Sequence, residues 1–285
     1  MIMKKLTGAK SIPNRLIKNF IMSLDPMKDL YDLSLGKNFL NEFVEWIQQS
    51  DLNQLQNLEL FKYRTLTCGT IQIFDHFYLR HIRKRFRIFK GEFMYHKAVL
   101  KNGGSVKFVE DGQLEKNDVL IMSVPFSDFG YQRHDTEEIL EKCTKLKIPV
   151  LLDLAYYPIT KDINLNLEHD CIETIGFSLS KAFYGCEWIR MGVRFQRQSI
   201  DDGIDVFNSV EMVNNVSISL SKSLINKYSV DYNWNKYENE YKTICKKLNL
   251  TETKCVLFGL GGKEYIECNR GGFVNRVTIA DYYSY

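Results

Sequence analysis

The chain has 285 residues, of which 45% are hydrophobic and 26% are charged, a composition typical of one large globular α/β domain or of a large domain with a small one. The formal net charge of +3 is too small to indicate a nucleic acid or another polyanion as a partner. Seven cysteines are scattered without a C-x-x-C pair, which argues against a zinc ribbon and against a secreted disulfide framework.

Targeting and membrane signals are weak. The first residues, MIMKKLTGAKSIPNRL, lack the long apolar core of a signal peptide. No run approaches the ~18 apolar residues that a membrane helix needs. We therefore expect a cytoplasmic protein without a membrane partner.

The N-terminal part of the chain is predicted to form an arm over residues 1–40, which contains the segment LYDLSLG (30–36). Residues 37–60 carry apolar side chains at helical spacing and predict a helix. Residues 67–84 are typical of a turn that opens a second helix. The basic run 80–87 is interpreted as a solvated helix end leading into a strand, with an anion or subunit contact as the alternative.

The middle of the chain alternates between apolar runs and one clear helix, predicted over residues 134–147 with Asp135 or Thr136 as its cap. The predicted strands cover residues 86–89, 105–110, 118–126, 148–157, 171–180 and 191–196. This alternation predicts an α/β fold, with a mostly parallel sheet flanked by helices in a large domain over residues 41–205. In such sheets, functional residues gather at the carboxyl ends of the strands.

The pattern changes after residue 205. Residues 207–228 and 232–250 have helical character, and residues 254–260 and 275–280 are typical of strands. This predicts a small α+β domain over residues 206–285.

Two predicted strands end on residues that could carry chemistry. Asp153 ends the run LLD, where a carboxylate is costly unless it caps a turn or pairs with a cation such as a protonated ring. Lys181 follows SLS at the next strand end, and is either a surface lysine or a buried nucleophile toward an aldehyde. Arg190 and the turn CGT (68–70), which opens a helix, are suited to phosphate. This ordered set describes a site for pyridoxal 5′-phosphate (PLP).

The same set resembles the fold type I PLP-dependent enzymes of the aminotransferase class I/II group, over nearly the whole chain. The segments DLAY (153–156) and SLSK (178–181) carry the resemblance most strongly. It implies Lys181 as the Schiff-base lysine, Asp153 at the pyridinium nitrogen and Tyr156 at the phenolic oxygen of the ring. Further residues are implied to bind the cofactor or the substrate. The implied cofactor residues are Cys68, Gly69, Thr70, Phe93 (with Tyr95 next best for stacking on the ring), Ser127, Ser178, Ser180 and Arg190, and the implied substrate residues are Gly36 and Arg276.

The chain departs from the pattern of this family in three places. Ser127 stands where the family usually has an asparagine that touches the ring oxygen. Arg190 follows Lys181 by nine residues instead of the usual eight, so Arg194 is the alternative phosphate ligand. The chain is also shorter than most family members, mainly in its C-terminal domain.

The resemblance implies a homodimeric aminotransferase that acts on an amino acid. The alternatives are another PLP reaction, by a lyase, decarboxylase, racemase or cyclase, or a non-catalytic binding protein that keeps the fold. Five histidines without metal-ligand spacing indicate no metal site, and His96 is noted because it lies beside the aromatic segment. Residues 259–265 (GLGGKEY) are interpreted as a plain turn and not as a phosphate loop.

Overall fold

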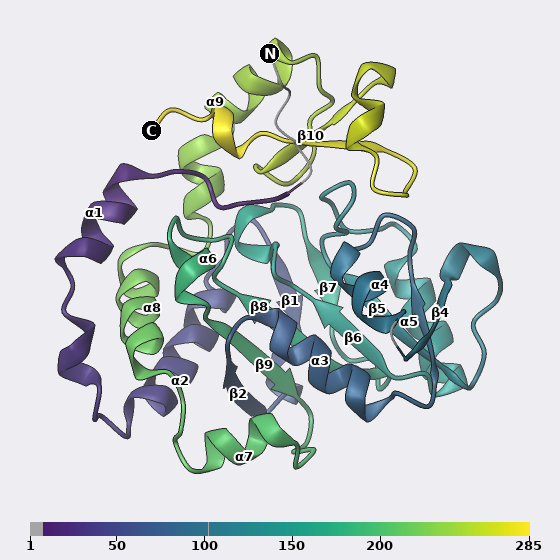
Figure 1. Ribbon diagram of the computed structural model, residues 1–285, viewed down its shortest axis with the longest axis horizontal. Helices are drawn as coiled ribbons and strands as arrows, with labels where there is room; N and C mark the ends of the chain where they lie inside the picture. Colours follow the sequence, from purple (N-terminus) through teal and green to yellow (C-terminus); the bar gives the residue numbers. More distant parts are fainter. Residues whose placement is uncertain (1–7, 102) are drawn as a thin grey trace.

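The centre of the molecule is a seven-stranded sheet (Figure 1), seen in a computed structural model that describes residues 8–101 and 103–285. Its strands are β2 (Tyr63–Thr67), β3 (Arg85–Ile88), β4 (Ser105–Phe108), β5 (Asp118–Ser123), β6 (Val150–Asp153), β8 (Ile172–Ser178) and β9 (Gly192–Gln196). They follow the order β2-β9-β8-β6-β5-β3-β4. Only β9 runs against its neighbours, so the predicted mostly parallel sheet is confirmed.

Helices cover both faces of this sheet. The helices are α1 (Arg15–Ser23), α2 (Leu35–Gln48), α3 (Thr70–Arg80), α4 (Met94–Leu100), α5 (Thr136–Leu146), α6 (Cys186–Ile189), α7 (Gly203–Ser209), α8 (Asn215–Lys227) and α9 (Tyr232–Lys247). Side chains alternate across a strand, so Val119 and Ile121 of β5 pack with residues of α3. Leu120 and Met122 of the same strand join the cluster that contains residues of α2, α5 and α8. Burial on both faces explains why β5 is a continuous apolar run.

The register of the parallel strands brings chemically important residues together at one edge. Ser123, the last residue of β5, pairs with Asp153, the last residue of β6. Asp153 in turn pairs with Gly176 of β8, two residues before Ser178. The carboxyl ends of three neighbouring strands therefore meet, as a parallel sheet requires.

The C-terminal unit has an apolar cluster of its own. It consists of α9 and the antiparallel strands β10 (Phe258–Gly261) and β11 (Asn275–Thr278) with the turns between them. Figure 1 shows it above the sheet, with the N-terminal segment passing between the two, and Ile12 of that segment belongs to its cluster. The buried apolar residues of α8 and Val230 pack in the cluster of the large sheet, whereas Trp234 and later residues pack in the cluster of the C-terminal unit. The chain therefore passes from one core to the other near residue 231, and the small domain was predicted to begin at residue 206.

The helix predicted over residues 37–60 is wrong in its second half. The helix α2 ends at Gln48, and the Ser50 hydroxyl and the Asp51 N–H both donate to the carboxylate of Asp231. The chain then forms β1 (Gln54–Gln56), which pairs in parallel with β7 (Asn164–Asn166). These partners lie more than 100 residues away in the sequence, so local periodicity could not show them.

The predicted helix after Gly69 and the predicted strand that returns at 192–196 agree with the structure. The helical stretch predicted over residues 207–228 is instead divided between α7 and α8, which residues 210–214 separate. The basic run 80–87 does connect the end of α3 to β3. One of its arginines, Arg87, is fully buried, and its Nη1 donates to Asp118 Oδ2 at 2.9 Å. Among the described residues, no helix is both long and apolar enough to cross a membrane.

Candidate active site

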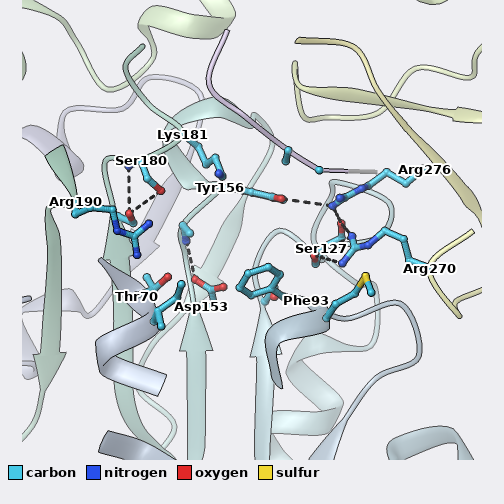
Figure 2. A pocket seen from close by; sticks show the side chains of 17 residues that line it. Thr70, Phe93, Ser127, Asp153, Tyr156, Ser180, Lys181, Arg190, Arg270 and Arg276 are labelled. Carbon is cyan, nitrogen blue, oxygen red and sulfur yellow. Dashed lines mark hydrogen bonds between the residues drawn. The ribbon is translucent and has the colours of Figure 1, made fainter. Parts of the chain in front are cut away.

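A cavity of about 400 Å³ lies at the carboxyl ends of β5, β6 and β8. Most of the predicted site residues line it, and so do residues from the C-terminal unit and the N-terminal segment. Figure 2 shows Thr70, Ser180 and Arg190 on one side, Arg270 and Arg276 on the other, and Asp153 and Phe93 between them. The pocket thus has two ends of different chemistry, joined by a middle that holds a carboxylate and an aromatic ring.

The first end, called the anion end below, is lined by hydrogen-bond donors. The helix α3 begins here at Thr70 with no acidic residue in its first turn and no side-chain cap, so its first backbone N–H groups face the pocket end without an internal anion. The Ser178 hydroxyl bonds the Ser180 hydroxyl at 2.9 Å, and both serines line the pocket. Arg190 adds a guanidinium, whose Nη2 donates to the carbonyl of Cys68 at 3.3 Å. Phosphate oxygens accept hydrogen bonds from hydroxyls, from the N–H groups at the start of a helix and from guanidinium groups.

Two glycines let the backbone close around this end. A Cβ on Gly192 would lie 2.7 Å from the Gly69 Cα and 2.7 Å from the Thr67 hydroxyl. Gly69 itself has a φ of +84° and packs against the Arg190 guanidinium. Larger residues at either position would push the start of α3 away from Arg190.

Arg190 reaches the pocket despite the extra residue after Lys181. The short helix α6 takes up the added length, between Gly185 (φ +102°) and Arg190 itself (φ +61°). Arg194 does not reach the pocket, because it lies on β9 and forms ion pairs with Asp202 and Asp205 at 2.6 Å each. The structure therefore places Arg190, and not Arg194, at the anion end.

Asp153 is the carboxylate in the middle of the pocket. It is 7% exposed, and its Oδ1 accepts a hydrogen bond from the Ala155 N–H at 3.0 Å. Burial raises its pKa from 3.8 to about 7, and the nearby carboxylate of Glu92 contributes to the rise. An ionised Asp153 would be strongly stabilised by a cation in the pocket.

Lys181 lies three residues after the end of β8 and lines the same pocket. Burial lowers the pKa of its amine, although the charge of Glu187 opposes that effect. A lowered pKa favours the uncharged amine, which is the nucleophilic form.

The middle of the pocket also holds two aromatic side chains. Phe93 precedes α4, is 36% exposed and lines the cavity. The Tyr156 hydroxyl lies 3.4 Å from the Arg276 Nη1. The aromatic alternative Tyr95 points elsewhere, because its hydroxyl donates to Asp75 at 2.8 Å.

Two arginines of the C-terminal unit form the second end. Arg276 of β11 and Arg270 of the preceding loop both donate from Nη1 to the Ser127 carbonyl, at 2.6 and 3.1 Å. Arg270 also bonds the Ser127 hydroxyl, so this hydroxyl lies on the arginine side of the pocket. Burial lowers the pKa of Arg270 to about 10, and the charge of Arg276 adds to that shift.

Three predicted site residues do not line the pocket: Gly36, Cys68 and Gly69. Gly69 directly precedes α3 and packs against the Arg190 guanidinium. Gly36 is in the first turn of α2, where the neighbouring Leu35 and Phe39 are buried in the main cluster, and it lines a separate hollow. Its predicted place over the substrate is therefore wrong. Cys68 is exposed and does not line the pocket; only its carbonyl takes part, through Arg190.

Several lining residues were not found from the sequence. Gly8 and Ala9 of the N-terminal segment line the pocket, as does Arg270, and none of the three was predicted. His96 is buried away from the cavity lining, and its Nδ1 bonds the Tyr78 hydroxyl at 2.5 Å. The segment 7–9 (TGA) and the six-residue spacing from Arg270 to Arg276 are the only sequence signals for these positions, and neither is specific.

No protein-family model and no curated protein matches the sequence. Solved structures do match the fold, at low sequence identity. They include the PLP-bound C-S lyase from Staphylococcus hominis, with a TM-score of 0.68 and 13% identity over 96% of this chain and 86% of that chain. Tyrosine aminotransferase from Leishmania infantum matches with a TM-score of 0.66 and 12% identity, over 96% of this chain and 87% of that chain.

L-threonine-O-3-phosphate decarboxylase from Porphyromonas gingivalis also matches, with a TM-score of 0.63 and 15% identity over 94% of this chain and 93% of that chain. At these identities the similarity shows the fold alone. The chain has the fold of the aminotransferase-like fold type I enzymes, as its sequence predicted. These three proteins are named for three different reactions, so the fold does not select among them.

Proposed function

We propose that the pocket binds PLP and that the protein is a PLP-dependent aminotransferase acting on an amino acid. The observation that carries this proposal is the arrangement of Lys181 and Asp153 in one buried pocket, beside an end lined by anion donors. Each of these features also occurs in structural roles, but together they match the separate parts of one cofactor.

The residues present fit that cofactor from end to end. The glycines at 69 and 192 leave room that a Cβ would fill, at the end where hydroxyls and Arg190 could hold a phosphate. Burial disfavours the ionised form of Asp153 and raises its pKa, and a protonated ring nitrogen would stabilise that form by opposite charge. Phe93 offers an aromatic face in the middle of the pocket, where a planar ring would lie.

When bound, PLP would supply an aldehyde that condenses with amines and a ring that takes up electron density from the amino acid. Asp153 would hold the proton on the ring nitrogen by opposite charge. The Lys181 amine, whose pKa burial lowers, would attack the aldehyde and later move a proton to and from the amino acid as general base and acid. Tyr156 would donate its hydroxyl proton to the phenolic oxygen of the ring.

Arg276 would bind the substrate carboxylate with its guanidinium. A fixed carboxylate orients the bonds at the α-carbon relative to the ring, which decides the bond that breaks. The N-terminal segment at Gly8 and Ala9 lines the pocket and would help to exclude water from the reaction.

A second candidate is another PLP reaction, such as that of a lyase, decarboxylase, racemase or cyclase. Ser127 favours this alternative, because it replaces the usual asparagine and bonds Arg270, so contacts to the ring oxygen would differ. A non-catalytic PLP-binding protein is the third candidate, and the retained Lys181 argues against it.

We also propose a homodimer. Large apolar side chains are exposed on α1, on the segment between α1 and α2, and on α6. They are Leu16, Met22, Met27, Tyr31, Leu33 and Trp188. A second copy of the chain would cover such a surface. Sedimentation should give twice the mass of the chain, and a fully active monomer would contradict the proposal.

The reaction is tested by a spectral screen of amino acids with the PLP-loaded protein, followed by identification of the products. An aminotransferase should convert the cofactor to pyridoxamine phosphate and release a 2-oxo acid. Release of ammonia or carbon dioxide would replace this proposal with the second candidate. Binding of PLP without turnover of any amino acid would favour the third candidate, a non-catalytic PLP-binding protein.

A further inference from the structure

Glu92 is a buried carboxylate that the proposed reaction does not use. It is 4% exposed, although burial of a carboxylate is costly unless hydrogen bonds compensate for the lost water. It does not line the pocket, but two residues of the pocket's middle adjoin it. Phe93 is the next residue in the chain, and Ser123 ends β5 beside Asp153 of β6. The position of Glu92 therefore points to a role behind the pocket wall.

The Glu92 carboxylate accepts three hydrogen bonds from these two neighbours. Its Oε1 accepts from the Ser123 N–H at 2.7 Å, and its Oε2 accepts from the Ser123 hydroxyl at 2.5 Å. The same Oε2 accepts from the Phe93 N–H at 2.8 Å. One side chain thus ties the main chain of Phe93 to the end of β5, which the sheet holds in register with Asp153.

The main chain at Glu92 is fixed as well. Gly91 has a φ of +87°, and the Asp128 carboxylate fills a slot between Gly91 and Gly272, where a Cβ on either glycine would overlap it. The Glu92 carbonyl accepts from Arg270 Nη2 of the C-terminal unit at 3.1 Å. The chain therefore enters Phe93 from a point that contacts on several sides determine.

Phe93 presents an aromatic ring to the middle of the pocket (Figure 2). Its ring stacks against Tyr95, with centroids 6.0 Å apart and an angle of 19° between the planes. It meets the edge of His96 at 5.7 Å. Stacking of a planar ligand on this ring depends on distance and offset, so it requires the main chain of Phe93 to stay in place.

We propose that Glu92 is a positioning residue that holds Phe93 at stacking distance from the ring of PLP. The inference rests on the proposed function for the identity of the ligand, and it goes beyond that function by assigning a role to a carboxylate outside the pocket. A carboxylate is needed because both of its oxygens accept from N–H groups. A glutamine has the same shape but only one accepting oxygen, so its NH2 group would face an N–H donor of Ser123 or Phe93.

The test is a double-mutant cycle on PLP affinity, measured by titration with PLP. One cycle combines Glu92→Gln with Phe93→Leu, which removes the aromatic ring but keeps an apolar side chain. A second cycle combines Glu92→Gln with Arg190→Gln at the anion end. Glu45→Gln, at an exposed position of α2, is the control for loss of a carboxylate. Circular dichroism and thermal unfolding establish that each variant is folded.

Glu92→Gln should weaken PLP binding by about tenfold, because hydrogen bonds to a charged group are lost. In the Phe93→Leu background the same change should cost about twofold or less, because no aromatic ring is left to position. In the Arg190→Gln background it should again cost about tenfold, because that residue acts at the other end of the cofactor. Glu45→Gln should leave the affinity unchanged.

An unchanged affinity in Glu92→Gln would overturn the proposal. An equal loss in the wild-type and Phe93→Leu backgrounds would overturn it too, because general destabilisation does not depend on the aromatic ring. If Glu92→Gln does not fold, Ser123→Ala takes its place in both cycles. It removes one of the three hydrogen bonds, and its expected loss of about threefold should likewise vanish in the Phe93→Leu background.

A wild-type protein that takes up no PLP would refute the proposed function, and hydrogen exchange of the PLP-free protein would then test the role of Glu92. The amides of Phe93 and Ser123 should exchange at least about tenfold faster in Glu92→Gln than in the wild type and in Glu45→Gln. Equal exchange rates in the three proteins would overturn the positioning role.

Discussion

Replacement of Asp153 by asparagine should change how the stability of the PLP-free protein depends on pH. Burial raises the pKa of Asp153 from 3.8 to about 7. Between these values the folded protein holds a proton that the unfolded chain has released, so folding stability falls as pH rises through this range. Asp153→Asn cannot ionise and should lack this loss.

The expected size of the effect follows from the two pKa values. At about 1.36 kcal/mol for each pH unit, the free energy of unfolding of the wild type should fall by about 2.5 kcal/mol between pH 5 and pH 8, relative to Asp153→Asn. The contribution of Asp128 is present in both proteins and cancels in the difference. The contribution of Glu92 cancels only in part, because its carboxylate interacts with that of Asp153.

Urea denaturation at pH 5, 6, 7 and 8 measures this difference, with Asp281→Asn as the control for an exposed carboxylate. Addition of PLP should remove most of the loss in the wild type, because a cation beside Asp153 lowers its pKa again. A difference that stays constant between pH 5 and pH 8 would refute the argument that burial controls this carboxylate. A loss that persists with saturating PLP would refute the pairing with a cationic ring.

Three further changes separate binding roles from structural ones. Arg190→Gln should weaken PLP binding by about tenfold or more at nearly unchanged stability, as measured by titration with PLP; unchanged affinity would remove Arg190 from the anion end. Arg194→Gln should instead cost about 3–5 kcal/mol of stability, because it leaves Asp202 and Asp205 without their buried partner; a stable variant with lost PLP binding would reverse the two assignments. Gly192→Ala should lower stability by about 1–3 kcal/mol, because the added Cβ would be too close to Gly69 and Thr67. PLP affinity should fall as well. Unchanged stability and affinity would show that the start of α3 need not stay close to Arg190.

The sequence predicted those parts of the site that depend on short segments at strand ends. Asp153 and Lys181 each end an apolar run, and a parallel sheet brings such ends together whatever the details of the loops. Thr70 was predictable for the same reason, because the turn before it opens a helix whose start faces that edge. These residues needed only local pattern and general topology.

The arginine end depended on contacts that no local pattern contains. Arg270 meets Ser127 across 143 residues of sequence, and the slot for Asp128 is formed by Gly91 and Gly272 from separate units. Gly36 was predicted to lie at the pocket because of the segment that precedes it. The burial of Leu35 and Phe39 instead holds Gly36 in the first turn of α2, and Gly8 and Ala9 line the pocket.

The central claim is that Lys181 forms a covalent bond with PLP in this pocket. The most direct measurement is reduction of the PLP-loaded protein with borohydride, followed by peptide mass mapping. The account predicts a visible absorbance band before reduction, a pyridoxyl group on Lys181 after it, and loss of both in Lys181→Ala. A colourless protein that takes up no PLP, or a label that lies on another lysine, would contradict it.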